Sequence, residues 1–115
     1  MDRIQDLTDK IVAFRDARDW KKFHNPKDLA LSLVLEAGEV MEHFQWKDAE
    51  EMKKHIAEHG ADIGEELADV LYWILLMGRD FNIDVLEALD KKIRKNAEKY
   101  PVEKAKGKHT KYNKL

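Results

Sequence analysis

The sequence lacks several of the parts on which many enzymes depend. It has no cysteine and a single serine (Ser32), so the sequence gives little support for catalysis by a thiol or hydroxyl nucleophile. It also has no G-x-x-x-x-G-K-[ST] loop, which excludes a P-loop nucleotide site. No HExxH motif or Cys/His cluster indicates zinc. Because we also find no membrane-spanning apolar run and no basic-then-apolar leader, we expect a cytoplasmic protein with no membrane partner.

Proline is scarce, with two residues in 115, and no convincing alternating apolar run predicts a strand. Apolar residues instead recur at helical spacing, which predicts one all-α domain, residues 1–115, built as a four- to five-helix bundle. Capping signals such as Asn25-Pro26, Asp48 with Glu51, and Asp84 with Glu87 divide the chain. The expected helices cover 2–18, 26–46, 48–60, 62–79 and 85–100, followed by a polar, irregular, basic tail over 102–115.

Residues 70–77 are eight consecutive apolar residues, so no side of this helix is suited to water. A chain of this length has too few other helices to cover the segment all round. We therefore expect a homo-oligomer that completes the core, with a dimer as the minimum unit and a tetramer as the expected assembly.

Two acidic pairs lie within apolar helical stretches, Glu36 with Glu39 and Glu66 with Asp69. The i, i+3 spacing places both carboxylates of each pair on one helix face. Charged side chains are rarely placed in apolar surroundings unless they are paired or bind an ion. The pattern predicts a cation between the two helices.

The identity of the cation follows from the ligand type. A di-iron carboxylate bundle needs a Glu-x-x-His pair on two helices, and none of the five histidines has a glutamate three residues before it. Carboxylate oxygens alone favour Mg²⁺, with Mn²⁺ as a substitute. Mg²⁺ is often completed by substrate phosphates, so the pattern indicates a nucleotide substrate.

Charge is distributed unevenly along the chain. Residues 36–69 hold eleven acidic and three basic residues, a net charge of −8, whereas residues 91–115 hold ten basic and two acidic residues, a net charge of +8. The basic segment is interpreted either as a solvated, frayed end or as a phosphate-facing surface. Two alternatives to an enzyme remain: a nucleic-acid-binding protein that uses this segment, and a helical oligomer that binds nucleotides without catalysis.

From Phe14 to Tyr112 the sequence resembles the MazG-like all-α nucleoside triphosphate pyrophosphohydrolases, particularly the dCTP pyrophosphatase branch. The E-x-x-E and E-E-x-x-D motifs in this order are specific to the family, and the aromatic RDW and FQW segments suggest the branch. The segments that carry the resemblance are Arg18-Asp19-Trp20, Phe23-His24, Leu35-Glu36-Ala37-Gly38-Glu39, Phe44-Gln45-Trp46-Lys47, Glu65-Glu66-Leu67-Ala68-Asp69-Val70-Leu71, Asn96, Tyr100-Pro101 and Lys111-Tyr112.

The resemblance implies hydrolysis of a (deoxy)nucleoside triphosphate, dCTP or a modified dCTP, to the monophosphate and pyrophosphate, in nucleotide-pool control or house-cleaning. It implies that Glu36, Glu39, Glu66 and Asp69 hold Mg²⁺ and that Lys92 and Asn96 face the phosphates. The implied base and sugar pocket consists of Trp20, Phe23, His24, Trp46 and Trp73.

Some roles are left open by the sequence. Glu65 is either the base that activates water or a residue that orients a lysine or arginine side chain. His43 is either a partner of the acidic residues or a surface residue. The sequence departs from the dCTP branch at Ile11, where that branch has histidine, and at Trp73, where it has tyrosine. The resemblance therefore predicts the reaction class more strongly than the preferred base.

Overall fold

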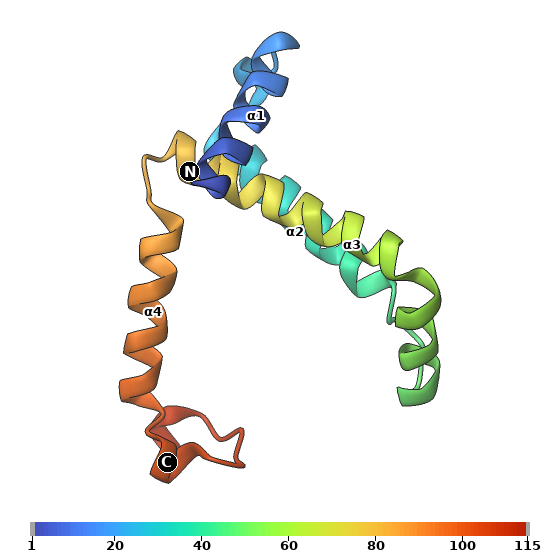
Figure 1. Cartoon of the computed structure of the whole chain (residues 1–115), viewed down its shortest axis with the longest axis vertical. Helices are drawn as coiled ribbons and strands as arrows, with labels where there is room; N and C mark the ends of the chain where they lie inside the picture. The colour runs from blue at the N-terminus through green and yellow to red at the C-terminus, as the bar shows by residue number, and fades with distance from the viewer. Residues whose placement is uncertain (1, 115) are drawn as a thin grey trace. The chain divides into compact units, whose positions relative to one another are not determined.

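The computed structural model describes residues 2–114, and within this range it contains helices and turns and no strand, as predicted (Figure 1). The chain forms two compact units that divide after Asn82. Among the described residues no helix is long and apolar enough to cross a membrane. The first unit contains α1, α2 and α3, and the second contains α4 and the C-terminal segment.

Helix α1 (Arg3–Ala17) has nearly the predicted bounds. The Asp2 carboxylate caps its N-terminus by accepting hydrogen bonds from the backbone N–H groups of Ile4 (3.0 Å) and Gln5 (3.2 Å). After α1 the chain makes a short 3₁₀ turn, η1 (Lys21–Phe23), in the segment predicted as a connector.

Helix α2 (Pro26–Glu42) begins as predicted, with the Asn25 side chain accepting a hydrogen bond from the backbone N–H of Asp28 at 2.9 Å. The predicted end at Trp46 is wrong, because the helix stops at Glu42 and residues 43–46 form a turn. The backbone there has i to i+3 bonds, and Trp46 takes a left-handed conformation with φ of +66° that no α-helix accommodates.

Helix α3 (Ala49–Asp80) is one helix where the sequence predicted two. Asp48 and Glu51 form the predicted capping box, with bonds of 2.9 and 3.2 Å. The expected break at Gly60 is instead a kink with non-helical angles at His59 (φ −122°, ψ 27°). Gly60 keeps a negative φ, so it does not adopt the left-handed conformation that ends many helices, and the chain continues as a helix.

The core of the first unit lies where α2 and α1 pack against α3. Leu29 on α2 and Leu75 and Leu76 on α3 are buried. Arg15 of α1 is 2 % exposed and donates two hydrogen bonds to Asp80 of α3, at 2.7 and 2.9 Å. This bidentate pair fastens α1 to the C-terminal end of α3.

The second unit begins with α4 (Val85–Lys99), which the Asp84 side chain caps by accepting a hydrogen bond from the backbone N–H of Glu87 at 3.0 Å. No residue of α4 is buried. The prediction of an irregular tail is corrected by α5 (Val102–Ala105) and the 3₁₀ turn η2 (Tyr112–Lys114). An edge-on contact between the Tyr100 and Tyr112 rings, 6.1 Å apart, helps to order the tail.

Candidate active site

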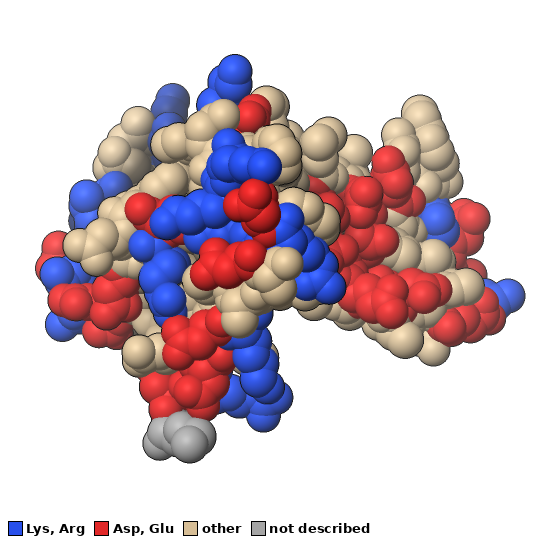
Figure 2. All heavy atoms as spheres, turned by 90° about the horizontal axis from the view of Figure 1, so that it is seen from above, with Lys and Arg blue, Asp and Glu red and all other residues tan. Residues whose placement is uncertain are grey.

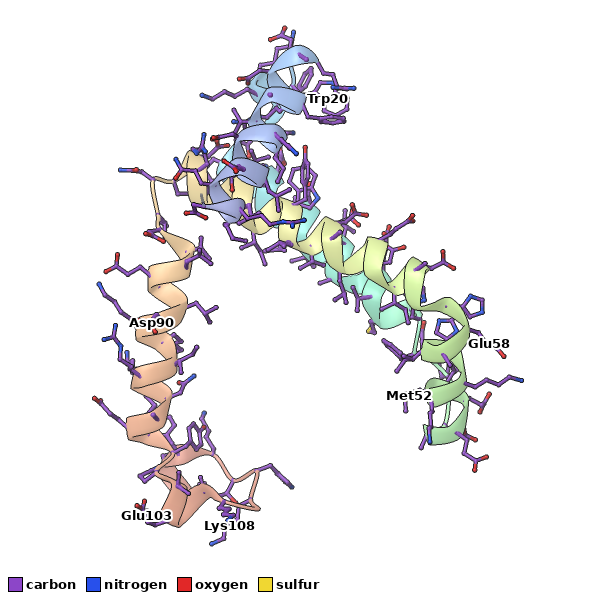
Figure 3. The ribbon with its side chains drawn as sticks, in the orientation of Figure 1. Trp20, Met52, Glu58, Asp90, Glu103 and Lys108 are labelled. Atoms are coloured by element: carbon purple, nitrogen blue, oxygen red, sulfur yellow. The ribbon has the colours of Figure 1, made fainter. Side chains whose placement is uncertain are left out.

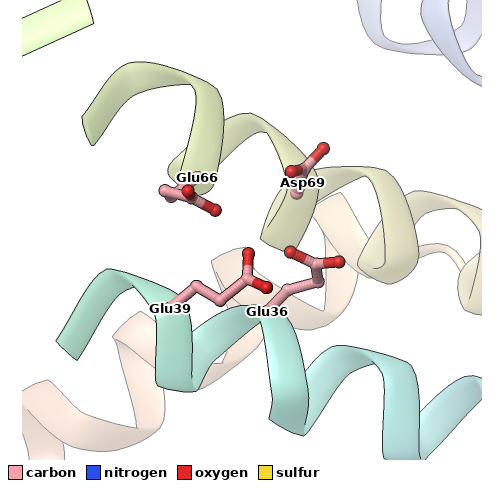
Figure 4. Close-up of side chains that lie close together, drawn as sticks. All are labelled: Glu36, Glu39, Glu66 and Asp69. Atoms are coloured by element: carbon pink, nitrogen blue, oxygen red, sulfur yellow. The ribbon is translucent and has the colours of Figure 1, made fainter. Parts of the chain in front are cut away.

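Two antiparallel helices bring the predicted metal ligands together. Figure 4 shows Glu36 and Glu39 on α2 pointing toward Glu66 and Asp69 on α3. One carboxylate oxygen from each of the four residues lies within 4.8 Å of the others. The side chains of Glu36 and Glu66 are half-buried, and those of Glu39 and Asp69 are exposed. We call these four residues the acidic quartet.

The carboxylates of the acidic quartet repel one another when ionised. The pKa of Glu66 is raised to about 7, chiefly by a hydrogen bond shared with Glu39 and then by desolvation and the neighbouring charges. The pKa of Glu36 is also raised, first by desolvation and then by its hydrogen bond with Glu39. The metal-free site therefore favours shared protons over four full negative charges.

The donor set fits a divalent cation with a preference for oxygen ligands. Oε2 of Glu36 is buried and has no hydrogen-bond partner, which is costly for a carboxylate oxygen unless a cation or water binds it. All four donors are carboxylate oxygens, as Mg²⁺ and Mn²⁺ prefer. The site can therefore take a divalent ion in exchange for its shared protons.

Glu65 precedes Glu66 on α3, and its side chain is exposed. Glu65 precedes Asp69 by one helical turn, so its side chain lies beside the face of α3 that carries Glu66 and Asp69. Among the described residues, its carboxylate does not belong to the converging group. Its role as a base stays a prediction.

The structure brings together two of the five residues predicted for the base and sugar pocket. The rings of His24 and Trp73 meet edge to face with centroids 5.5 Å apart. Trp73 follows Asp69 by one helical turn, so this aromatic pair lies beside the acidic quartet. His24 also lines a cavity of about 470 Å³ together with Arg15 and Lys21.

The other predicted aromatic residues are more exposed. Trp20 follows the C-terminus of α1 (Figure 3) and contacts Phe14 edge-on at 5.8 Å. Phe23 is 61 % exposed, and Trp46 is 91 % exposed in the turn after α2. A single chain therefore does not enclose these side chains in a pocket.

Lys92 and Asn96 lie one turn apart on α4, and both are exposed. They belong to the second unit, whereas the acidic quartet belongs to the first. Their predicted contact with substrate phosphates stays a prediction.

The structure also shows a cleft next to the acidic quartet that the sequence interpretation missed. It has a volume of about 280 Å³. Its lining residues are Glu39, Glu42, His43, Lys47, His55 and Glu66. The signal in the sequence was the i, i+4 spacing of Glu39 and His43, but no local pattern connects His55 with either residue.

A model of the MazG-like family matches residues 31–115 of this chain. The chain belongs to the MazG-like family. The matched region contains the whole acidic quartet, so the family assignment rests on the same helices that build the site.

Individual relatives agree with this assignment. The MazG-like chain is 34 % identical over 114 residues to dCTP pyrophosphatase 1 of Mus musculus and of Homo sapiens, covering 97 % of this chain and 67 % of each relative. A pyrophosphatase from Archaeoglobus fulgidus, known from a crystal structure, superimposes with a TM-score of 0.84 at 36 % identity, covering 88 % of this chain and 94 % of that one. The predicted family, the all-α fold and the enzyme class, a nucleoside triphosphate pyrophosphohydrolase, are confirmed.

Proposed function

We propose that this MazG-like protein uses Mg²⁺ to hydrolyse a (deoxy)nucleoside triphosphate to the nucleoside monophosphate and pyrophosphate. The observation that supports the proposal is the convergence of four carboxylates, of which Glu36 has a buried Oε2 without a hydrogen-bond partner. In this proposal Glu36, Glu39, Glu66 and Asp69 hold the cation, and Mn²⁺ is a substitute. When bound, the ion supplies Lewis acidity to the phosphate oxygens and lowers the pKa of a bound water.

In the proposed reaction, a bond forms between the water oxygen and the α-phosphorus, and the bond from the α-phosphorus to the bridging oxygen breaks. The electron pair of the broken bond leaves with pyrophosphate. A carboxylate takes the proton of the attacking water, and Glu65 is our candidate for it. With a cation bound, the acidic quartet would hold the phosphate chain in place relative to the water, which is the positioning that phosphoryl chemistry needs.

We further propose a cytosine nucleotide, dCTP or a modified dCTP, as the substrate. The support is the similarity to proteins named dCTP pyrophosphatase 1. His24 and Trp73, in contact at 5.5 Å, provide a flat surface and a polar edge for the nucleoside. Trp20, Phe23 and Trp46 join this pocket in the proposal, with Lys92 and Asn96 at the phosphates. Trp46 is supplied by a second chain, because the turn that holds it and Lys47 lies at the opposite end of the acidic quartet in its own chain.

The experiment that tests this function is a product analysis over the eight common ribo- and deoxyribonucleoside triphosphates, with MgCl₂ and with EDTA. We expect monophosphate and pyrophosphate, in a metal-dependent reaction that is fastest with dCTP. Diphosphate and phosphate as products would contradict the reaction class, and a different preferred nucleotide would contradict only the cytosine assignment. No turnover would favour the non-catalytic alternative.

The basic segment provides a second test, because Lys and Arg side chains are concentrated in residues 91–114. The surface of the α2–α3 arm, on the right in Figure 2, is by contrast dominated by acidic side chains. We expect no tight binding to random oligonucleotides, because the acidic surface repels nucleic acid. Low-micromolar binding that weakens steeply with salt would support nucleic-acid binding instead.

We propose that the chain acts as a single functional domain within a homo-oligomer, with a dimer as the minimum and a tetramer as the expected state. Large apolar side chains of the first unit are exposed in one chain, including Val34 (66 %), Leu35 (69 %) and Leu67 (54 %). Exposed large apolar side chains in such number are typical of a surface that packs against another chain. Light scattering should give at least twice the chain mass. Leu35→Lys should lower that mass, whereas Gln5→Lys, at an exposed polar position of α1, should not.

A further inference from the structure

The candidate site has different kinds of side chain at its two ends along α3. Trp73 lies one turn after Asp69, about 6 Å along the axis, and contacts His24. On the other side of the acidic quartet lies the 280 Å³ cleft, which we call the histidine–lysine cleft. Glu39 and Glu66 belong both to the acidic quartet and to the wall of this cleft. The cleft therefore begins where the quartet ends.

Lys47 is the only lysine or arginine in the wall of the histidine–lysine cleft. Its side chain is half-buried and forms no ion pair in the part of the chain that the structure describes. The turn that holds it is fixed on both sides, by the left-handed backbone of Trp46 and by the cap that Asp48 provides for α3. An ammonium group without a partner is thus held beside the quartet.

A pair of imidazoles completes the cleft. Nδ1 of His43 lies 2.8 Å from Nε2 of His55, so one ring donates to the other. Two neutral imidazoles carry two N–H groups in total. One N–H is used between the rings, and the other remains available to an acceptor in either tautomeric arrangement. The pKa of His55 is lowered by desolvation and by Lys47, His59 and His43, which favours the neutral ring.

We propose that the histidine–lysine cleft holds the β- and γ-phosphates, and hence the leaving pyrophosphate, while the nucleoside is directed to the His24–Trp73 side. This inference rests on the proposed function and gives the substrate a direction across the acidic quartet. A nucleotide has an aromatic ring at one end and an anionic chain at the other, and the site has the matching order of groups. Lys47 and the free imidazole N–H then face the oxygens that gain negative charge as the bond to the α-phosphorus breaks.

The experiment compares ligands for the two ends of the site by calorimetry in MgCl₂, with pyrophosphate and dCMP as probes. Lys47→Gln should weaken pyrophosphate binding about tenfold, the factor that corresponds to one well-placed charged contact, and should leave dCMP binding unchanged. His55→Asn, which removes the imidazole pair, should weaken pyrophosphate binding about threefold. Lys27→Gln is the matched control, because Lys27 is exposed at the N-terminus of α2 and does not line the cleft.

Steady-state kinetics add an independent readout. With dCTP as substrate, Lys47→Gln should raise KM and lower kcat, whereas Lys27→Gln should change neither. If Lys47→Gln binds pyrophosphate as tightly as Lys27→Gln does, or loses dCMP affinity to the same extent, the inference is wrong. Wild-type hydrolysis of dCTP in that case keeps the proposed function intact, and only a wild type without any turnover overturns both.

Discussion

The two units of the chain use the same kinds of interaction in different surroundings. In the first unit, Arg15 and Asp80 form a bidentate pair whose side chains are 2 % and 14 % exposed. In the second, Arg94 and Asp90 pair at 3.1 Å on α4 with side chains 66 % and 71 % exposed. Water screens the second pair and not the first, so only the first is expected to be costly to break.

The difference extends to function. The first unit contains a buried core and brings the four carboxylates of the acidic quartet together by itself. The second unit has an amphipathic helix, α4, whose Leu86, Leu89 and Ile93 are about half exposed. In the proposed function the first unit therefore carries out the chemistry, and we expect the apolar side of α4 in the second unit to pack against another chain.

The largest expected effect is on activity, from Glu36→Gln in the first unit. We expect kcat/KM to fall by on the order of 10²–10³-fold, because the substitution removes a charged ligand of the cation that the acidic quartet is proposed to hold. Thermal unfolding of the metal-free variant should occur at the same or a higher temperature, since a repelling charge is gone. Glu58→Gln, an exposed position on α3 (Figure 3), is the matched control and should keep full activity. A loss of activity accompanied by unfolding would contradict the assigned role.

The next effect is on stability, from Asp80→Asn. This change leaves the buried Arg15 guanidinium without its ionic partner, so the free energy of unfolding should fall by about 3 kcal/mol. For a chain of this size the corresponding loss in Tm is roughly 10 °C. Urea denaturation monitored by circular dichroism measures the change in the free energy of unfolding. Arg15→Met combined with Asp80→Leu should recover most of the loss, because the pair is then replaced by apolar contacts, and a failure to recover would point to a role beyond pairing.

A third, intermediate effect is the response of the metal-free protein to pH. The pKa values of Glu36 and Glu66 are raised in the folded state from a reference of 4.5, that of Glu66 to about 7. Between these pH values the folded protein binds more protons than the unfolded chain, so its stability should fall as pH rises. Mg²⁺ at a hundred times its dissociation constant should add about 2.7 kcal/mol.

The test is a series of thermal unfolding curves from pH 5 to pH 8, in EDTA and in MgCl₂. The gain in stability from Mg²⁺ should be largest above pH 7, where Glu66 is ionised and a proton on that carboxylate no longer competes with the ion. Glu36→Gln should flatten the pH dependence in EDTA. An equal gain from Mg²⁺ at pH 5 and pH 8 would contradict a site made of these carboxylates.

Much of this arrangement was predictable because it depends on local chemistry. The caps at Asn25, Asp48 and Asp84 set helix starts within the chain, and the two i, i+3 acidic pairs specified which helix faces meet. Helix ends were less predictable, since the left-handed Trp46 and the kink at His59 depend on how each turn packs. Contacts between distant residues, Arg15 with Asp80 and His43 with His55, carry no local signal because only the folded helices bring them together.

The smallest expected effect is that of Asp90→Asn in α4, the same chemical change as Asp80→Asn made in the second unit. Breaking the exposed pair with Arg94 should cost less than about 0.5 kcal/mol, and added salt should remove even that difference, because the charges are already screened. Parallel urea denaturation of the two Asp→Asn variants measures the contrast. A cost near that of Asp80→Asn would mean that another chain covers this face of α4, since only a desolvated pair is expensive to break. The oligomer would then bury the Asp90–Arg94 pair of the second unit. Both units would contain a buried ion pair, shielded from water by the same chain in the first unit and by another chain in the second.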